Sequence, residues 1–493
     1  MNNPVSDEIT NFRQQTISGI AWSSISNIVR QISSIIVSII LARLMSPSEF
    51  GLIAMVTVLT NFLQIYINEG FSTAIIQKKN LTSMQCSSAF WLNISAGFVF
   101  MALFILLSPF IALFYEQPIL QFMTILIAVN FPLSSLGIVQ RALIRKNLGF
   151  KVLCFIDVGA IIISGIVAIV LVYMGFGVWS LIIQVLLLSS LSSLFLWIKS
   201  AWTPGFVFKW AAVRHLLHFS SNVWGNTTLN YIVRNLDNLL IGKYIGAVAL
   251  GNYGRAYSLM LMPLRSISSV FAKVMLPSFS IIQTDKLRVK NLYLRMVSVI
   301  SLFTFPMVFG FFIVAEHFVL SVLGDQWADC IPILKILCLC SWTQSIFTTV
   351  GAIYHSQGRP DLALKIGAFQ KCIIVMGIVI GLKWGVLGVA TGYAIASLIN
   401  CIPCSYFPGR LINMTPWELW RSLSGIIFCA LTMAIFTYFI GTCLPKEWPH
   451  WAFLLVMVFF GMIIYMGLLF VTKLNVYYDL KNVVTEQLIK NRS

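Results

Sequence analysis

Residues 38–51 read SIILARLMSPSEFG and residues 238–251 read NLLIGKYIGAVALG, and the two stretches align without gaps at an offset of 200 residues. Gly51 then falls on Gly251. A second, shorter match keeps the same order at a similar spacing, with PIL at 118–120 and at 332–334. Because the two sequence matches follow in the same order along the chain, they indicate that one helical unit has been duplicated. Two such units facing each other across a cleft are the usual plan of a carrier.

The composition places this duplication in a membrane. The chain has 493 residues, of which 58% are hydrophobic and only 10% are charged. A soluble domain cannot hide that much apolar surface, so we predict an all-α polytopic membrane protein with about 14 transmembrane helices. The predicted spans are 16–41, 51–68, 89–113, 120–140, 152–173, 178–198, 216–241, 253–274, 292–315, 333–354, 362–382, 386–406, 419–440 and 451–471.

The repeat also predicts the domain organisation. We expect an N-terminal six-helix lobe at 1–205 and a C-terminal six-helix lobe at 206–410, followed by two additional helices and a cytoplasmic tail at 411–493. Because each repeat holds an even number of spans, both copies enter the membrane in the same direction. Their pseudo-twofold axis should therefore run along the membrane normal.

The loops alternate in charge. One set carries most of the lysines and arginines, including Lys78, Arg141, Arg145, Lys146 and Lys199. Cytoplasmic loops hold the excess of positive charge, so we expect both termini in the cytoplasm. The formal net charge of +17 is mainly this topology signal. We expect no nucleic-acid partner and no bound nucleotide, because the sequence has no separate basic module and no G-x-x-x-x-G-K-[ST] motif.

Four predicted spans carry polar residues at steps of three or four, so each set falls on one helical face. They are 16–41 and 51–68 and their repeat counterparts 216–241 and 253–274. The simplest arrangement is a shared wet cavity, although helix–helix hydrogen bonding would use the same residue types. The polar residues expected to line the cavity are Asn27, Asn61, Gln64, Asn222, Asn226 and Asn230.

Arginines in these spans are the other candidates. A charge at mid-bilayer costs about 2.5–3.5 kcal/mol on insertion scales. Arg234 lies three residues before Asp237, which could neutralise it, whereas Arg30 has no acid within a turn and needs a distant partner or an anionic ligand. Arg255 and Arg265 lie nearer the span ends, where snorkelling is an alternative. Guanidinium groups suit bidentate phosphate binding, so these four arginines are the predicted substrate-binding cations.

Three runs carry a family resemblance: LARLMSPSEFGLIAMVTVLTNFLQIYINEGFSTAIIQKKN at 41–80, NLDNLLIGKYIGAVALGNYGRAYSLMLMP at 235–263 and VMLPSFS at 274–280. With them the chain resembles the Wzx-like polysaccharide flippases of the multidrug/oligosaccharidyl-lipid/polysaccharide exporter superfamily. Within that branch it is most similar to exporters of colanic-acid-like and teichuronic-acid-like repeat units.

The resemblance implies translocation of an undecaprenyl-pyrophosphate-linked oligosaccharide by alternating access, for lipopolysaccharide, capsule or exopolysaccharide biosynthesis. It implies that Arg30, Arg234 and Arg255 meet the pyrophosphate. It also implies a multi-pass protein of the bacterial inner membrane that is not an enzyme, with a polysaccharide polymerase and a chain-length regulator as further partners. We expect neither a cofactor nor a metal.

Two alternatives stay open. A cation or drug antiporter of the same superfamily would share the fold but would bury acids rather than arginines. A membrane polymerase or ligase of lipid-linked sugars would need a sizeable outer loop, and the longest one, at 316–332, is short.

Without a nucleotide site, transport must follow an ion gradient, the membrane potential or consumption of the product. Asp237 and Glu69 are the candidates for ion coupling.

Overall fold

The regular structure of the chain is helical. The computed structural model describes residues 4–78, 81–445 and 447–474, and no strand occurs in these ranges. Within them the side chains of residues 4–21, 23–24, 69–71, 212–213, 215–226, 229, 265–266, 268–270 and 272–274 lie outside the description. The predicted all-α class is confirmed.

Eleven helical stretches of the described residues are long and apolar enough to cross a membrane. One of them, Pro360–Leu411, covers two predicted spans, 362–382 and 386–406. The predicted spans 216–241 and 253–274 lie on two further long helices that are not among the eleven. The chain is therefore a multi-pass membrane protein.

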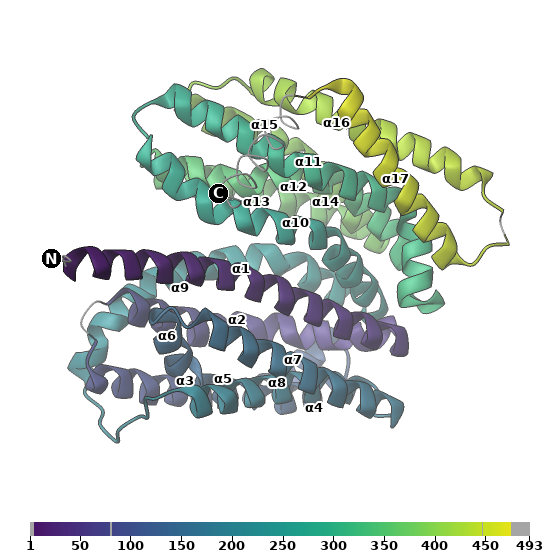
Figure 1. The fold of residues 1–493 in the computed structure, drawn as a ribbon. Helices are drawn as coiled ribbons and strands as arrows, with labels where there is room; N and C mark the ends of the chain where they lie inside the picture. The colour runs from purple at the N-terminus through teal and green to yellow at the C-terminus, as the bar shows by residue number, and fades with distance from the viewer. Residues whose placement is uncertain (1–3, 79–80, 446, 475–493) are drawn as a thin grey trace. The chain divides into compact units, whose positions relative to one another are not determined.

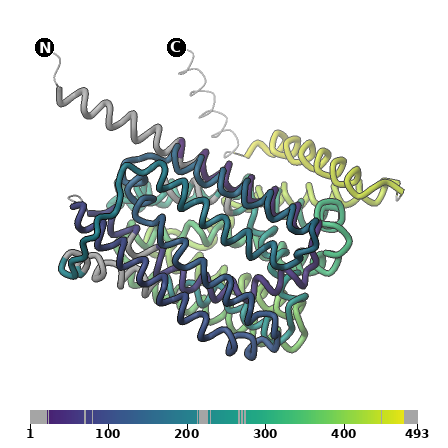
Figure 2. The backbone as a smooth tube through the Cα atoms, turned by 90° about the horizontal axis from the view of Figure 1, so that it is seen from below, coloured from purple at the N-terminus to yellow at the C-terminus, as the bar shows by residue number. Residues whose placement is uncertain are grey.

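By their internal contacts, residues form two compact units, Met1–Gly251 and Asn252–Ser493. The helices of the first unit run alongside one another over much of their length (Figures 1 and 2). They are α1 (Pro4–Leu44), α2 (Pro47–Gln77), α3 (Ser83–Tyr115), α4 (Ile119–Ala128), α5 (Asn130–Ser135), α6 (Ile138–Lys146), α7 (Phe150–Tyr173), α8 (Val178–Lys199) and α9 (Trp210–Tyr244).

Capping boxes start two of these helices. In α2 the Ser46 hydroxyl accepts from the backbone N–H of Glu49 at 3.4 Å, and the Glu49 carboxylate accepts from the backbone N–H of Ser46 at 2.8 Å. Thr82 and Gln85 repeat the arrangement at the start of α3. Each box satisfies backbone N–H groups that have no partner inside the helix, so the short S/T-x-x-E/Q signals set where these helices begin.

Helix α9 packs against α2. The Tyr231 hydroxyl donates to the backbone oxygen of Val58 at 2.8 Å, and the Tyr66 hydroxyl lies 2.9 Å from the Thr228 hydroxyl. These contacts hold α9 in the first unit, whereas the predicted repeat boundary lies before it, at 205/206. The six-helix lobes and their pseudo-twofold relation stay a prediction.

Two glycines related by the 200-residue offset pack against each other's helix starts. A Cβ on Gly51 would lie 1.8 Å from the backbone oxygen of Ala247, and a Cβ on Gly251 would lie 1.9 Å from that of Pro47. No side chain fits at such distances, so both positions need glycine for the close approach of the backbones. The reciprocal contact agrees with the internal repeat in which these glycines correspond.

The second unit is built around a long central helix, α11 (Lys286–Phe318), which packs against α12, α16 and α17. A core of buried residues from α10, α11, α12, α16 and α17, including Phe279, Tyr293 and Phe305, joins these helices. The further helices are α10 (Ala247–Ile281), whose first residues belong to the first unit, α12 (Cys330–Ser356), α13 (Pro360–Gly381), α14 (Gly385–Ile399), α15 (Cys401–Leu411), α16 (Pro416–Cys443) and α17 (His450–Thr472).

Candidate functional site

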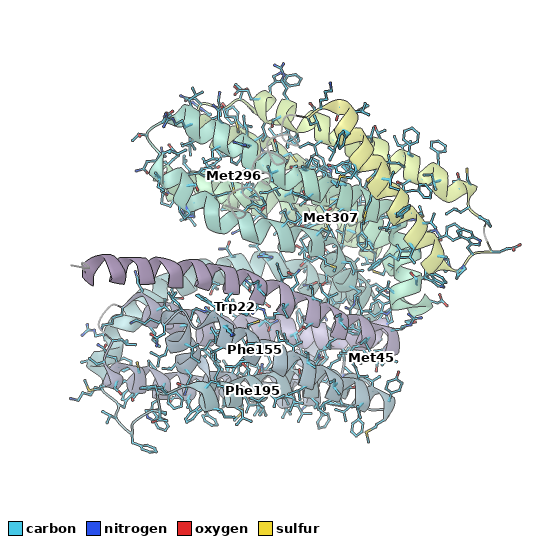
Figure 3. The ribbon with its side chains drawn as sticks, in the orientation of Figure 1. Trp22, Met45, Phe155, Phe195, Met296 and Met307 are labelled. Atoms are coloured by element: carbon cyan, nitrogen blue, oxygen red, sulfur yellow. The ribbon has the colours of Figure 1, made fainter. Side chains whose placement is uncertain are left out.

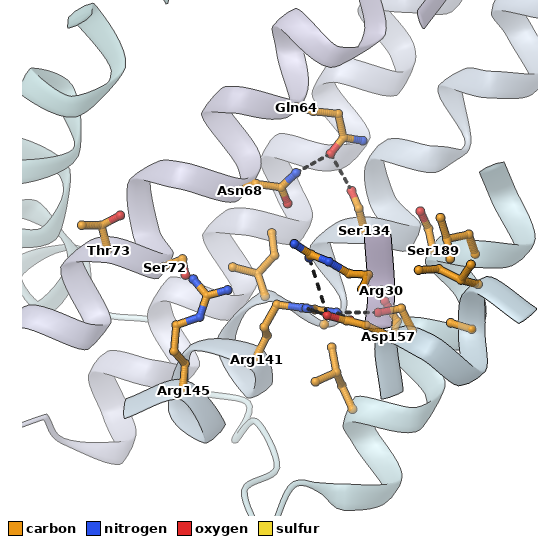
Figure 4. Close-up of a pocket in the computed structure, with 18 residues that line it drawn as sticks. Arg30, Gln64, Asn68, Ser72, Thr73, Ser134, Arg141, Arg145, Asp157 and Ser189 are labelled. Atoms are coloured by element: carbon orange, nitrogen blue, oxygen red, sulfur yellow. Dashed lines mark hydrogen bonds and ion pairs between the residues drawn. The ribbon is translucent and has the colours of Figure 1, made fainter. Parts of the chain in front are cut away.

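The first unit contains a polar cavity of about 400 Å³ (Figure 4). Six helices, α1, α2, α5, α6, α7 and α8, contribute its wall. The lining combines three arginines and one aspartate with hydroxyl and amide side chains. These residues are Arg30, Arg141, Arg145 and Asp157, together with Gln64, Asn68, Ser72, Thr73, Ser134, Ser189, Ser192 and Ser193.

An arginine–aspartate pair lies in this cavity. Arg141 of α6 donates to both carboxylate oxygens of Asp157 of α7, at 3.2 and 2.7 Å, and also to the Ser192 hydroxyl of α8 at 2.7 Å. The side chains of Arg141 and Asp157 are 26% and 14% exposed. A two-pronged guanidinium–carboxylate pair is among the stronger polar contacts in proteins, so it joins three helices around the cavity.

Arg30 of α1 reaches the same carboxylate from another direction. Its Nη1 lies 3.8 Å from Asp157 Oδ2, and its Nη2 donates to the Asn27 side-chain oxygen at 3.2 Å. The distant acidic partner that the sequence analysis allowed for Arg30 is therefore Asp157. The ion pair is long and the Arg30 side chain is 50% exposed, so its guanidinium also remains accessible to a ligand.

An amide pair lies beside the arginines. Asn68 Nδ2 donates to Gln64 Oε1 at 2.8 Å, and the Ser134 hydroxyl lies 3.3 Å from the same oxygen. The Nε2 group of the buried Gln64 has no hydrogen-bond partner. A buried donor without a partner costs free energy, so Gln64 Nε2 is a polar group in the cavity wall whose hydrogen bond the protein itself does not satisfy.

The cavity lies toward one end of its helices. Thr73, Arg145 and Leu196 line it, and each is within about one turn of the end of α2, α6 or α8. This is the end that carries the basic loop residues. One of these, Lys146, donates to the backbone oxygen of Lys78 and so caps α2. By the predicted topology, the cavity belongs to the cytoplasmic half of the first unit.

The other predicted site residues whose side chains the structure describes do not line this cavity. Asn61 is exposed on α2 and Asn230 is half-buried on α9, and neither lines the cavity. Arg234 is exposed, while Asp237 is buried and accepts from the backbone N–H of Asn238 at 2.8 Å. In the described part of α9 no ion pair joins Arg234 to Asp237, since the Arg234 side chain is exposed whereas Asp237 is buried. A coupling role for Asp237 stays a prediction.

Arg255 belongs to the second unit. Its guanidinium lies over the ring of Trp327, 5.3 Å from the ring centroid, and Trp327 itself is fully buried. This stacking gives Arg255 a cation–π partner in the loop before α12. The side chains of Arg265, Asn222, Asn226 and Glu69 lie outside the described residues, so these four predictions stay untested.

Sequence reasoning missed Arg141 and Arg145 as cavity residues. The predicted span 120–140 ends just before Arg141, so both arginines counted only as cytoplasmic loop charges. The structure instead breaks this segment into α4, α5 and α6, and the last piece carries both arginines at i and i+4 along the cavity. Pro132 and Gly137 within the run were the signal for the breaks.

A second cavity, of about 830 Å³, lies within the second unit between α10, α11, α16 and α17. Its lining is apolar except for Thr437 and Tyr465, and Figure 3 labels Met307 in its wall. Six methionines line this cavity. Methionine side chains are unbranched and flexible, so they can pack against a flexible apolar ligand. The six are Met262, Met307, Met433, Met457, Met462 and Met466.

Cysteines and possible metal ligands are the remaining side chains to place. Cys401 and Cys404 are buried and free, and Cys330 and Cys443 are also free. Within the described ranges, no group of three or more His, Cys, Asp or Glu side chains is placed to hold a metal ion.

The helices are apolar and cross the membrane several times, and the arginine-lined cavity lies near the helix ends that carry the basic loops. The chain is therefore an integral membrane protein with an internal polar site. The family model "Polysaccharide biosynthesis protein" matches residues 40–332, and the chain belongs to this family. The match contains the three runs that carried the resemblance in the sequence, so that prediction is confirmed.

Curated relatives cover most of the chain. It is 28% identical over 437 residues to the teichuronic acid biosynthesis protein TuaB of Bacillus subtilis (strain 168), covering 88% of this chain and 90% of that protein. It is 28% identical over 400 residues to the lipopolysaccharide biosynthesis protein WzxC of Escherichia coli (strain K12), covering 80% of this chain and 81% of that one.

Solved structures share the fold. The lipid II flippase MurJ in its inward closed conformation matches with a TM-score of 0.75 at 16% identity, covering 93% of this chain and 99% of that one. An inward-facing multidrug resistance transporter of the MATE family matches with a TM-score of 0.63 at 14% identity, covering 78% and 98%. At these identities the likeness concerns the fold alone.

Proposed function

We propose that the protein is a flippase that moves an undecaprenyl-diphosphate-linked oligosaccharide from the inner to the outer leaflet of the bacterial inner membrane for surface polysaccharide biosynthesis. The observation that carries the proposal is the cavity in which Arg30, Arg141 and Arg145 accompany a single acid, Asp157. Guanidinium groups bind phosphate oxygens through two parallel hydrogen bonds, so this cavity suits a diphosphate.

The rest of such a ligand also has a counterpart in the chain. Hydroxyl and amide groups beside the arginines, Gln64, Asn68 and Ser134 among them, suit the first sugar. Separately from this site, the second unit holds an apolar, methionine-lined cavity of its own, and the chemistry of its lining suits a polyprenyl chain. The names of the relatives, which refer to teichuronic acid and lipopolysaccharide biosynthesis, agree with this substrate class.

The alternatives fit the cavity less well. A cation antiporter needs an acid that is open to its ligand, and here Asp157 is engaged by Arg141 through both carboxylate oxygens. We therefore infer a carrier of an anionic lipid rather than a cation antiporter. The short outer loop at 316–332 offers little room for the catalytic groups of a polymerase or ligase, so we infer a carrier rather than such an enzyme. A polysaccharide polymerase and a chain-length regulator are the expected partners downstream.

A deletion strain tests the function. Cells without the gene should accumulate the lipid-linked repeat unit on the cytoplasmic face and lose the surface polysaccharide, and a plasmid copy should reverse both effects. Accumulation is measured by extracting the lipid-linked oligosaccharides, and sidedness by their access to an impermeant glycosidase in right-side-out vesicles. Normal delivery to the outer leaflet in the deletion strain would rule out the flippase assignment.

Reporter fusions test the proposed orientation. Fusions after Lys146 and Lys286 and at the C-terminus should be active with a cytoplasmic reporter, and a fusion after Asp325 should be active with a periplasmic one. The physical reason is the excess of lysine and arginine in the first set of loops. Exchanged signals at two or more of these sites would contradict both the orientation and the cytoplasmic placement of the arginine-lined cavity.

A further inference from the structure

We propose that Asp157 is an internal counter-ion that occupies Arg141 while the cavity is empty and yields it to the diphosphate when the substrate enters. Asp157 thereby weakens substrate binding and speeds release, which sets the turnover of the carrier. This inference rests on the proposed function, because it concerns how the same cavity handles its ligand.

The geometry of the pair resembles that of a bound phosphate. The two oxygens of Asp157 take both prongs of the Arg141 guanidinium, at 3.2 and 2.7 Å, which is the arrangement that two phosphate oxygens would adopt. Arg141 also donates to the Ser192 hydroxyl at 2.7 Å. A phosphate can therefore bind the Nη1 and Nη2 edge of Arg141 only by displacing the carboxylate.

The charges around Asp157 determine how much free energy is gained when a diphosphate replaces the carboxylate on Arg141. Arg141 and Arg30 face the carboxylate, the latter at 3.8 Å, and Arg145 lines the same cavity. When a diphosphate replaces Asp157 on Arg141, one charge-assisted pair is broken as another forms. The net gain is then much smaller than for a guanidinium that was hydrated beforehand.

A carrier benefits from such a limit on affinity. Differences in affinity between related complexes lie mostly in the dissociation rate, so the same cavity without the Asp157 carboxylate would hold a diphosphate for longer. Asp157 and Arg141 both belong to the first unit and lie within hydrogen-bonding distance, so the carboxylate is placed to bind the guanidinium again when the phosphate leaves. The carboxylate is thus placed to promote release without contacting the substrate itself.

The substitution Asp157→Asn tests the proposal because asparagine keeps the size and removes the charge. In nanodiscs containing the full-length protein, undecaprenyl diphosphate should bind about tenfold more tightly to the variant and dissociate more slowly. Export in cells should fall although binding improves. Inorganic pyrophosphate, used as a competitor, should show the same tightening, because the effect concerns the diphosphate and not the lipid chain.

A structural role for Asp157 predicts the opposite result. If the carboxylate only holds Arg141 in place, Asp157→Asn should weaken binding, and weaker or unchanged binding would overturn the proposal. Should the variant not fold, as judged by size-exclusion profile and melting temperature, Asp157→Glu serves instead. Its longer side chain fits Arg141 less well, so it should tighten binding by a smaller factor, and weaker or unchanged binding would count against the proposal in the same way.

A double variant shows whether the effect acts through Arg141. In an Arg141→Gln background, Asp157→Asn should no longer tighten binding, whereas an unchanged tightening would refute the exchange.

The control Lys199→Ala removes a positive charge from α8 outside the cavity and should leave binding unaltered. If wild-type protein binds no undecaprenyl diphosphate, the proposed function fails; if it binds and Asp157→Asn does not bind more tightly, only the role of Asp157 fails.

Discussion

Arg30→Ala is expected to abolish export of the lipid-linked oligosaccharide while the protein is still made and inserted. A diphosphate that enters a cavity of low dielectric constant must find positive charge, because its desolvation would otherwise exclude it. Arg30 is the more accessible of the two arginines at Asp157, with 50% of its side chain exposed against 26% for Arg141. Loss of a charged hydrogen-bond donor costs about 1.5–3 kcal/mol, so binding should fall by roughly 10- to 150-fold.

The measurement compares surface polysaccharide, accumulated lipid-linked repeat unit and protein level in one set of strains. Arg30→Lys should restore part of the export, because lysine keeps the charge and loses the planar fork. Arg43→Ala is the matched control: Arg43 is exposed on the same helix and does not line the cavity. Normal polysaccharide in Arg30→Ala cells with normal protein levels would remove the case for an anionic ligand and favour the cation antiporter.

Composition and hydrophobic patterning were sufficient to predict the membrane class and most of the helices. The capping boxes at Ser46 and Thr82 could also be read directly, because a cap depends on residues only three positions apart. Arg30 and Gln64 were predicted to line a cavity for a similar reason, although the cavity that they line lies within the first unit, and no described residue of the predicted spans 216–241 and 253–274 contributes to its wall. Arg30 and Gln64 each lie inside a span with a clear polar face, where a charged or amide group needs a partner.

The remaining members of the site depend on contacts between distant parts of the chain. Arg141 is a loop charge in any span prediction that ends at Gln140, and only its pairing with Asp157 brings it into the cavity. Local sequence also fails to predict that α9 packs on α2, since the contact of Tyr231 with Val58 joins residues far apart in the chain. Helical periodicity indicates which face of a helix is polar, and it does not identify the helix that the face meets.

Gly461→Leu is expected to reduce export strongly by filling the apolar cavity of the second unit. Gly461 lies on α17 in the cavity wall, and a Cβ there would be 3.4 Å from the Thr437 hydroxyl on α16, so a leucine at this position takes up space at the wall of the cavity. Each buried methylene of a lipid chain contributes about 0.8 kcal/mol. Displacing three or four of them should therefore weaken binding of undecaprenyl diphosphate by roughly 100-fold.

Two comparisons make this result specific to the lipid chain. Inorganic pyrophosphate should bind Gly461→Leu as well as it binds the wild type, because the arginine-lined cavity belongs to the first unit. Gly467→Leu is the matched control on the same helix, since a Cβ there meets nothing within 4 Å and the residue does not line the cavity. Both changes replace glycine by a better helix former, so helix propensity does not explain a difference between them, and the melting temperatures of the two variants show whether the packing of α17 on α16 is kept. Equal export by the two variants would contradict a role for this cavity in holding the polyprenyl chain, and the diphosphate site would then have to account for substrate recognition by itself.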